Sequence, residues 1–232
     1  NESEQAAVLR VIELVLEITY KEEMTSQKKR DIIDSRERLT TIIAKETTTT
    51  LCSQIIPCIS NPSSMETQFQ ATKTLAELLP FIGGDIIRTT TPAIFIAARC
   101  EGKQNRDEEN AVETRRHAFV CLTIIAGSHY HSLEHIFEQC KTVTLKAVQH
   151  DNERVGHYAM GFWNTLCDTE ESMNNSKDSN KSQTCKHYIQ TNFKELIPIV
   201  YEAMCKQTED DKKGALCIQA ACLAKLIATV VG

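Results

Sequence analysis

An alanine recurs at the same place in five predicted helices of this chain. In each window the alanine is followed, four and seven residues later, by residues that can share its helical face. A small residue at such a position lets a neighbouring helix approach, and the larger residues fill the space beyond it. The repetition predicts a row of similar helical units rather than one globular core. The five alanines are Ala7, Ala71, Ala118, Ala159 and Ala220.

The spacing of these alanines indicates the kind of repeat. Successive alanines are 64, 47, 41 and 61 residues apart, and the two middle values match the period of about 40 to 47 residues of HEAT or armadillo repeats. Each alanine helix and the partner helix before it would form an αα-hairpin. The chain is therefore predicted to be all-α, a single HEAT-repeat (armadillo-like) α-solenoid of about five repeats over residues 1–232. The partner helices are expected at 49–60, 92–100, 133–149 and 188–206.

The composition supports helices and disfavours some functions. Glycine and proline are scarce, with 8 and 5 residues, and aromatic residues make up 6% of the chain. The net charge of −5 gives no basic stripe for nucleic acid. The sequence contains no apolar run of 18 residues, so no membrane insertion is predicted. The ten cysteines form no Cys-x-x-Cys motif and mostly fall on apolar helical faces, which indicates free thiols in a reducing compartment.

The two longer spacings each contain a polar excess of about 20 residues. Residues 21–47 are charged but carry several isoleucines and a leucine, which predicts an extra helical insertion. Residues 169–186 (TEESMNNSKDSNKSQTCK) have no apolar stripe and are predicted to form a flexible polar loop that the fold does not need.

The stretch GFWNTLCD at 161–168 could be read as an aromatic pocket with a thiol and a carboxylate. Helical spacing instead places Phe162, Trp163, Leu166 and Cys167 on one core face. His129, His131 and His135 could approach a metal, but the order of a zinc protease and a matching third ligand are missing, so surface histidines are favoured. No phosphate loop or triad context occurs. We expect no catalytic residue, no metal and no cofactor.

Several motifs in order resemble the importin-β (karyopherin-β) family of nuclear transport receptors, in the N-terminal half of those proteins. The resemblance is strongest at GFWNTLCDTEES, at KHYIQTNFKELIPIVYEAMCKQTEDD and at CIQAACLAKLIAT, and QATKTLAELLPF extends it upstream. It is collinear from about residue 50 to residue 232. The resemblance implies a HEAT-repeat receptor, present in cytoplasm and nucleus and at the nuclear pore. Its implied partners are Phe-Gly nucleoporins, the GTPase Ran, and importin-α or a cargo protein.

In that family the Phe-Gly motifs enter shallow grooves between consecutive outer helices. By position, one groove wall here would be Leu51, Cys52 and Ile55, and the other Thr91, Ile94 and Phe95. Thr91 stands where the family usually has a carboxylate. The alternative is that these residues only seal the contact between repeats.

The resemblance also implies a Ran or cargo contact at the acidic turn Glu209, Asp210 and Asp211. This turn is shorter than the family's acidic loop, and Gly214 takes the place of the family's tryptophan. A solvated connection is the simpler interpretation of the turn from its charge alone. For the whole chain, the alternative function is a HEAT-repeat scaffold subunit of a multiprotein complex, such as a protein phosphatase.

Overall fold

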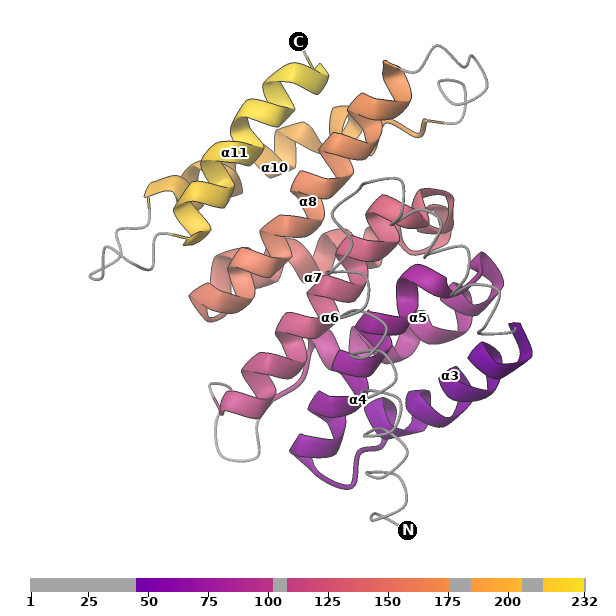
Figure 1. The fold of residues 1–232 in the computed structure, drawn as a ribbon. Coiled ribbons are helices and arrows are strands. Elements are labelled where there is room, and N and C mark those ends of the chain that lie inside the picture. The colour runs from indigo at the N-terminus through magenta and orange to yellow at the C-terminus, as the bar shows by residue number, and fades with distance from the viewer. Residues whose placement is uncertain (1–44, 102–107, 176–184, 206–214, 232) are drawn as a thin grey trace, which may run out of the picture. The chain divides into compact units, whose positions relative to one another are not determined.

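The structure, a computed structural model, describes residues 45–101, 108–175, 185–205 and 215–231 (Figure 1). Within these ranges the regular elements are α-helices and short 3-10 helices, with no strand. The chain divides into two compact units, residues 1–118 and 119–232, and the division falls inside helix α6 (Glu109–Ser128). None of the described helices is long and apolar enough to cross a lipid bilayer.

The first unit is built around helix α3 (Lys45–Ser60), which packs against both α4 (Met65–Leu78) and α5 (Gly84–Ala98). The 3-10 helix η1 (Leu79–Phe81) follows α4 directly. Ser64 caps α4 by accepting the Thr67 backbone N–H at 3.1 Å, which satisfies one of the donors left free at a helix start.

A buried polar chain ties the ends of these helices together. The Gln68 amide donates from Nε2 to the Ile59 carbonyl at 2.8 Å and accepts from the Cys100 thiol at 3.1 Å. The guanidinium of Arg115, which is fully buried, donates to the Cys100 carbonyl at 2.8 Å. Buried polar groups are tolerated in a core when they are paired in this way.

The second unit contains two helical hairpins. The 3-10 helix η2 (Tyr130–His135) leads into α7 (Phe137–His150), which packs against α8 (Glu153–Asn174). The second hairpin pairs α10 (Tyr188–Cys205) with α11 (Ala215–Val231). Between the hairpins, α10 packs on α7 and α11 packs on α8, so like helices stack on like helices, as in a repeat array.

The alanine pattern is confirmed wherever the structure describes it. Ala71, Ala118, Ala159 and Ala220 are all fully buried, in α4, α6, α8 and α11. The fifth alanine lies outside the described residues. The prediction of all-α helical hairpins is therefore confirmed, while the count of about five repeats in one continuous solenoid stays a prediction.

Several helix boundaries differ from those expected. Helix α3 begins at Lys45, four residues before the predicted start at residue 49. Helix α5 begins at Gly84, eight residues before the predicted start at residue 92, because Pro92 lies inside the helix instead of opening it. The predicted partner helix at 133–149 is divided into η2 and α7 at Ile136. Gly83 is the N-cap residue of α5, and Gly84 is its first residue.

The predicted loop at 169–186 is wrong at its N-terminal end, because helix α8 continues through Asn174. Residues 185 and 186 lie outside the helices, as predicted, although Cys185 is buried. The physical reason is Glu170, a fully buried carboxylate whose partners are two backbone N–H groups at the start of α10 and a tyrosine hydroxyl. The loop was predicted because the segment has little apolar area to bury. Glu170 stabilises it in another way, by accepting hydrogen bonds, and composition does not reveal this. Residues 176–184 lie outside the described residues, as do residues 21–44 of the predicted insertion.

Candidate protein-binding surfaces

Most of the predicted groove residues lie in the core of the first unit. Cys52, Ile55, Thr91, Ile94 and Phe95 are buried, and Leu51 is half-buried. The two walls belong to α3 and α5, which pack directly against each other. These side chains therefore fill the contact between the helices instead of lining an open furrow, as the alternative interpretation expects.

The polar members of this group are also engaged inside the protein. The Thr91 hydroxyl donates to the Ile87 carbonyl one turn earlier in α5, at 2.6 Å. Burial raises the pKa of the Cys52 thiol to about 11, so the thiol stays neutral near pH 7. Neither side chain offers a polar group to a ligand.

One exposed apolar side chain on α5 was missed by the sequence analysis. Ile96 is 44% exposed, although Ile94 and Phe95 beside it are buried. Pro92, one turn before Ile96, is exposed as well. The sequence carries little signal for this difference, because the stretch AIFIAA is apolar on every side of the helix. Leu51 on α3 and Ile96 on α5 are thus accessible apolar side chains on the two helices that carry the predicted walls.

A longer exposed apolar surface lies on α10. Ile197, Tyr201 and Met204 are 45%, 68% and 38% exposed, and their spacing of four and three residues places them on one side of the helix. We call these three residues the α10 stripe. Contiguous exposed apolar groups of this kind mark candidate contact surfaces for other proteins.

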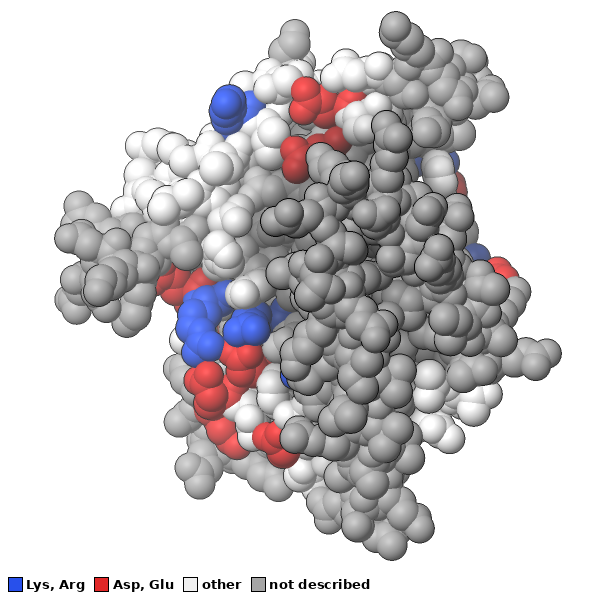
Figure 2. Space-filling view, viewed as in Figure 1, with Lys and Arg blue, Asp and Glu red and all other residues white. Residues whose placement is uncertain are grey.

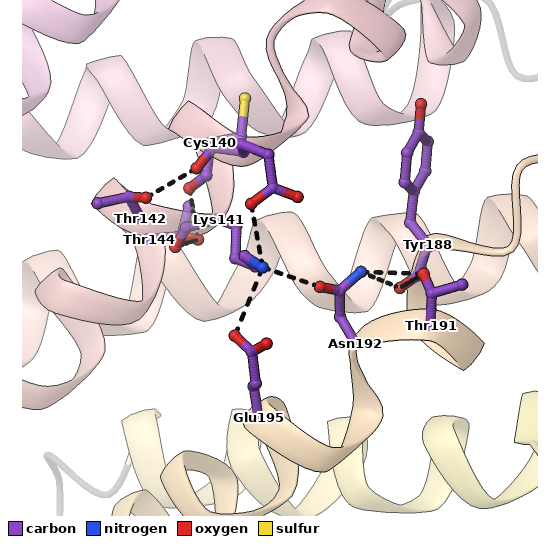
Figure 3. A network of polar contacts seen from close by, with 9 residues as sticks. Cys140, Lys141, Thr142, Thr144, Tyr188, Thr191, Asn192 and Glu195 are labelled. Carbon is purple, nitrogen blue, oxygen red and sulfur yellow. Dashed lines mark hydrogen bonds and ion pairs between the residues drawn. The ribbon is translucent and has the colours of Figure 1, made fainter.

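The opposite side of α10 is held on α7 by Lys141 (Figure 3). Its ammonium donates to the Asn192 side-chain oxygen at 3.0 Å and lies 3.4 Å from the Glu195 carboxylate. Glu138 on α7 is a third partner at 3.1 Å. At about 100° per residue, Ile197 and Tyr201 project about half a turn away from this contact, so the stripe points away from α7.

Comparisons with known proteins show what this chain is similar to. Importin subunit beta-1 from Arabidopsis thaliana is 33% identical over 130 residues, which are 52% of this chain and 15% of that protein. The Schizosaccharomyces pombe protein of the same name is 26% identical over 142 residues, 57% of this chain and 16% of that protein. A crystal structure of importin beta matches the whole chain with a TM-score of 0.74 at 19% identity. The chain is importin-β-like.

The match covers a small part of the larger proteins. The importin-β-like chain spans about a sixth of the length of the curated relatives and 25% of the chain in the matching crystal structure. The structural match supports the all-α HEAT-repeat solenoid as its fold class. No protein-family model matches the chain.

Where described residues of the importin-β-like chain are visible in Figure 2, basic and acidic side chains form small groups, and no group of one sign dominates there. Patches of mixed sign steer partners only weakly. The predicted acidic turn Glu209, Asp210 and Asp211 lies outside the described residues.

The histidines considered as metal ligands are spread around η2. His129 is half-buried, whereas His131 and His135 are exposed. In the described part of the importin-β-like chain, no group of three or more histidine, cysteine, aspartate or glutamate side chains could hold a metal ion.

Proposed function

We propose that this importin-β-like chain works in a nuclear import receptor that binds Phe-Gly nucleoporins, Ran, and importin-α or a cargo protein. The observation that carries the proposal is its sequence similarity to two proteins named importin subunit beta-1. A receptor of this kind moves between cytoplasm and nucleus and contacts the nuclear pore. The net charge of −5 fits protein partners better than nucleic acid.

For the Phe-Gly contact we propose the outer surface of α3 and α5. Leu51 and Ile96 supply accessible apolar groups on these helices, and the buried residues Cys52, Ile55, Thr91, Ile94 and Phe95 belong to the core of the same unit. A phenylalanine that buries its ring against such a surface gains about 1.5 to 3 kcal/mol. One contact of this strength is weak, but many linked motifs bind together with useful avidity.

The test is retention of the chain on a column that carries a Phe-Gly repeat peptide, with a Ser-Gly repeat column as background. Ile96→Asp and Leu51→Asp place a charge on the proposed surface, and each is expected to reduce specific retention at least about tenfold. Ser53→Asp is the matched control, because it adds the same charge at an exposed position of α3 that lies about half a turn away from Leu51, and it should leave retention unchanged. Circular dichroism of each variant checks that the helices remain.

A second variant locates the site if the first surface is wrong. Ile197→Asp changes the α10 stripe and is expected to leave retention unchanged. Loss of retention in Ile197→Asp alone would move the Phe-Gly site to the α10 stripe. A wild-type chain that never binds the Phe-Gly column would favour the scaffold function instead.

For Ran and basic cargo we propose a contact at Glu209, Asp210 and Asp211. Three adjacent carboxylates attract basic surfaces over about 10 Å at 0.1 M ionic strength. Replacing all three with the corresponding amides should weaken capture of GTP-loaded Ran, and the difference should shrink at 0.5 M salt. Equal capture by the amide variant and the wild type would remove this turn from the proposal.

A further inference from the structure

The start of α10 is capped by a carboxylate from another helix. Glu170 lies near the end of α8 and is fully buried. Its Oε1 accepts the Tyr188 backbone N–H at 2.6 Å, and its Oε2 accepts the Ile189 N–H at 3.1 Å. These are the first two residues of α10, whose N–H groups have no acceptor within the helix. Glu170 thus takes the part that a side chain at the N-cap usually plays.

The local backbone is shaped for this carboxylate. His187 precedes α10, and its carbonyl accepts the Thr191 N–H at 3.0 Å, the first bond of the helix. Among the described residues, His187 is the one non-glycine residue with a positive φ, 54°. A left-handed residue beside helical ones turns successive N–H groups toward one point, which makes a concavity that binds anions. The bonds that the Glu170 carboxylate accepts therefore offset the conformational cost of the left-handed backbone at His187.

A tyrosine from a third segment joins the same carboxylate. The Tyr130 hydroxyl, at the start of η2, donates to Glu170 Oε1 at 2.7 Å and accepts the Lys186 N–H at 2.9 Å. Burial, together with the adjacent Glu170, holds the pKa of Tyr130 well above its ordinary value, so the hydroxyl keeps its proton. The cap consequently joins η2, α8 and the residues that lead into α10.

The rest of α10 is held by other contacts. Three of its four buried residues, Leu196, Val200 and Ala203, lie beyond the first turn, and so do the α10 partners of Lys141, whereas the fourth, Ile189, is in the first turn. Near the cap, the ring of Tyr188 stacks on that of Phe137, with 4.1 Å between the ring centroids. The rings of Phe137 and Trp163 meet edge-on, with 6.1 Å between their centroids. Movement of the first turn of α10 would thus change the environment of Trp163, the single tryptophan of the chain.

We infer that Glu170 is a latch that fixes the first turn of α10 to α8 and η2, and that breaking it releases this turn while the second unit stays folded. The inference does not depend on the partner that the chain binds. The carboxylate is required because a glutamine at 170 has one oxygen where the cap uses two, and its NH₂ group would face a backbone N–H.

The test is hydrogen exchange of individual backbone amides in Glu170→Gln, measured in the whole chain by NMR. We expect the Tyr188 and Ile189 amides to exchange at least about tenfold faster than in the wild type. The amides of Val200 and Ala203 should keep their protection, and the emission of Trp163 should change. Glu171→Gln is the matched control, since Glu171 is the half-buried neighbour, and it should leave all of these readings unchanged.

A milder variant covers a failure of Glu170→Gln to fold. Tyr130→Phe keeps the carboxylate and removes one hydroxyl, so the Lys186 amide should exchange faster while the later turns of α10 stay protected. A folded Glu170→Gln with wild-type protection at Tyr188 and Ile189 would overturn the inference. Faster exchange spread evenly over the second unit, or loss of fold in both variants, would overturn it too, because the cap would then hold the whole unit and not a separable turn.

Discussion

Trp163 shows how one side chain combines packing with a polar bond. It is fully buried in α8, and its indole N–H donates to the Thr144 hydroxyl on α7 at 3.0 Å. Its ring meets Phe137 and Phe162 edge-on, at 6.1 and 5.4 Å, a favourable arrangement for aromatic rings. The prediction that Phe162, Trp163, Leu166 and Cys167 form one core face is confirmed, because all four are fully buried.

Replacing Trp163 with alanine should therefore lower the free energy of unfolding by about 3 to 5 kcal/mol, because a large cavity is left in a close-packed core. Urea denaturation followed by circular dichroism measures this loss, since the substitution removes the fluorescent side chain. Trp163→Phe should cost less, because it keeps most of the ring volume and loses only the bond to Thr144. A loss below about 1 kcal/mol for the alanine variant would contradict the burial of Trp163.

At the scale of the element, α8 contains a glycine that the packing does not require. A Cβ at Gly161 would have the Thr123 hydroxyl oxygen as its nearest neighbour, at 3.9 Å. Gly161→Ala should therefore raise the free energy of unfolding by about 0.5 to 1 kcal/mol, because alanine loses less conformational entropy in a helix. Thermal unfolding of the whole chain measures the change.

Gly127 in α6 gives the matched comparison. A Cβ there would lie 3.1 Å from the Thr165 methyl group, so Thr165 must shift and the gain in helix propensity is offset. The free energy of unfolding of the Gly127→Ala variant should be lower than that of the Gly161→Ala variant. The reverse order would mean that α6 has more room beside α8 than these distances allow.

The helices could be predicted from sequence where a small residue and its apolar neighbours repeat, as around Ala71 and Ala159. The exposed side of α5 could not be predicted in the same way, because Ile94 and Ile96 have the same chemistry and only packing decides which is buried. The end of α8 was misjudged for a different reason. The partners of Glu170 lie 18 and 19 residues further along the chain, and no local pattern signals a capping carboxylate at that distance.

Across the whole molecule, burial keeps several thiols neutral. It raises the pKa of Cys52 to about 11 and that of Cys140 and Cys167 to about 12, with nearby carboxylates adding to the shift at Cys167. Burial also raises the pKa of Cys121. An unfolded cysteine titrates near pH 8.5, so above that pH the unfolded chain loses protons that the folded chain keeps.

The stability contributed by these thiols is present below about pH 8.5 and is lost as the pH rises toward 11 and 12. For each such thiol, the free energy of unfolding falls by up to about 1.4 kcal/mol for every unit by which the pH rises in that window. Urea midpoints should fall between pH 8 and pH 10.5, and Cys167→Ala should show a shallower fall. Equal midpoints at the two pH values would contradict the neutral buried state of these thiols.

The distribution of the ten cysteines also allows the unfolding of the chain to be followed through the order in which they react. Seven are buried, Cys217 is partly accessible, and Cys205 and Cys222 are exposed, the last three all on the α10–α11 hairpin. A short pulse of an alkylating reagent therefore adds mass to the native chain at two or three sites of known position. Every further adduct marks the exposure of one buried cysteine at a known position, so mass spectrometry can order the opening of these positions without any engineered label.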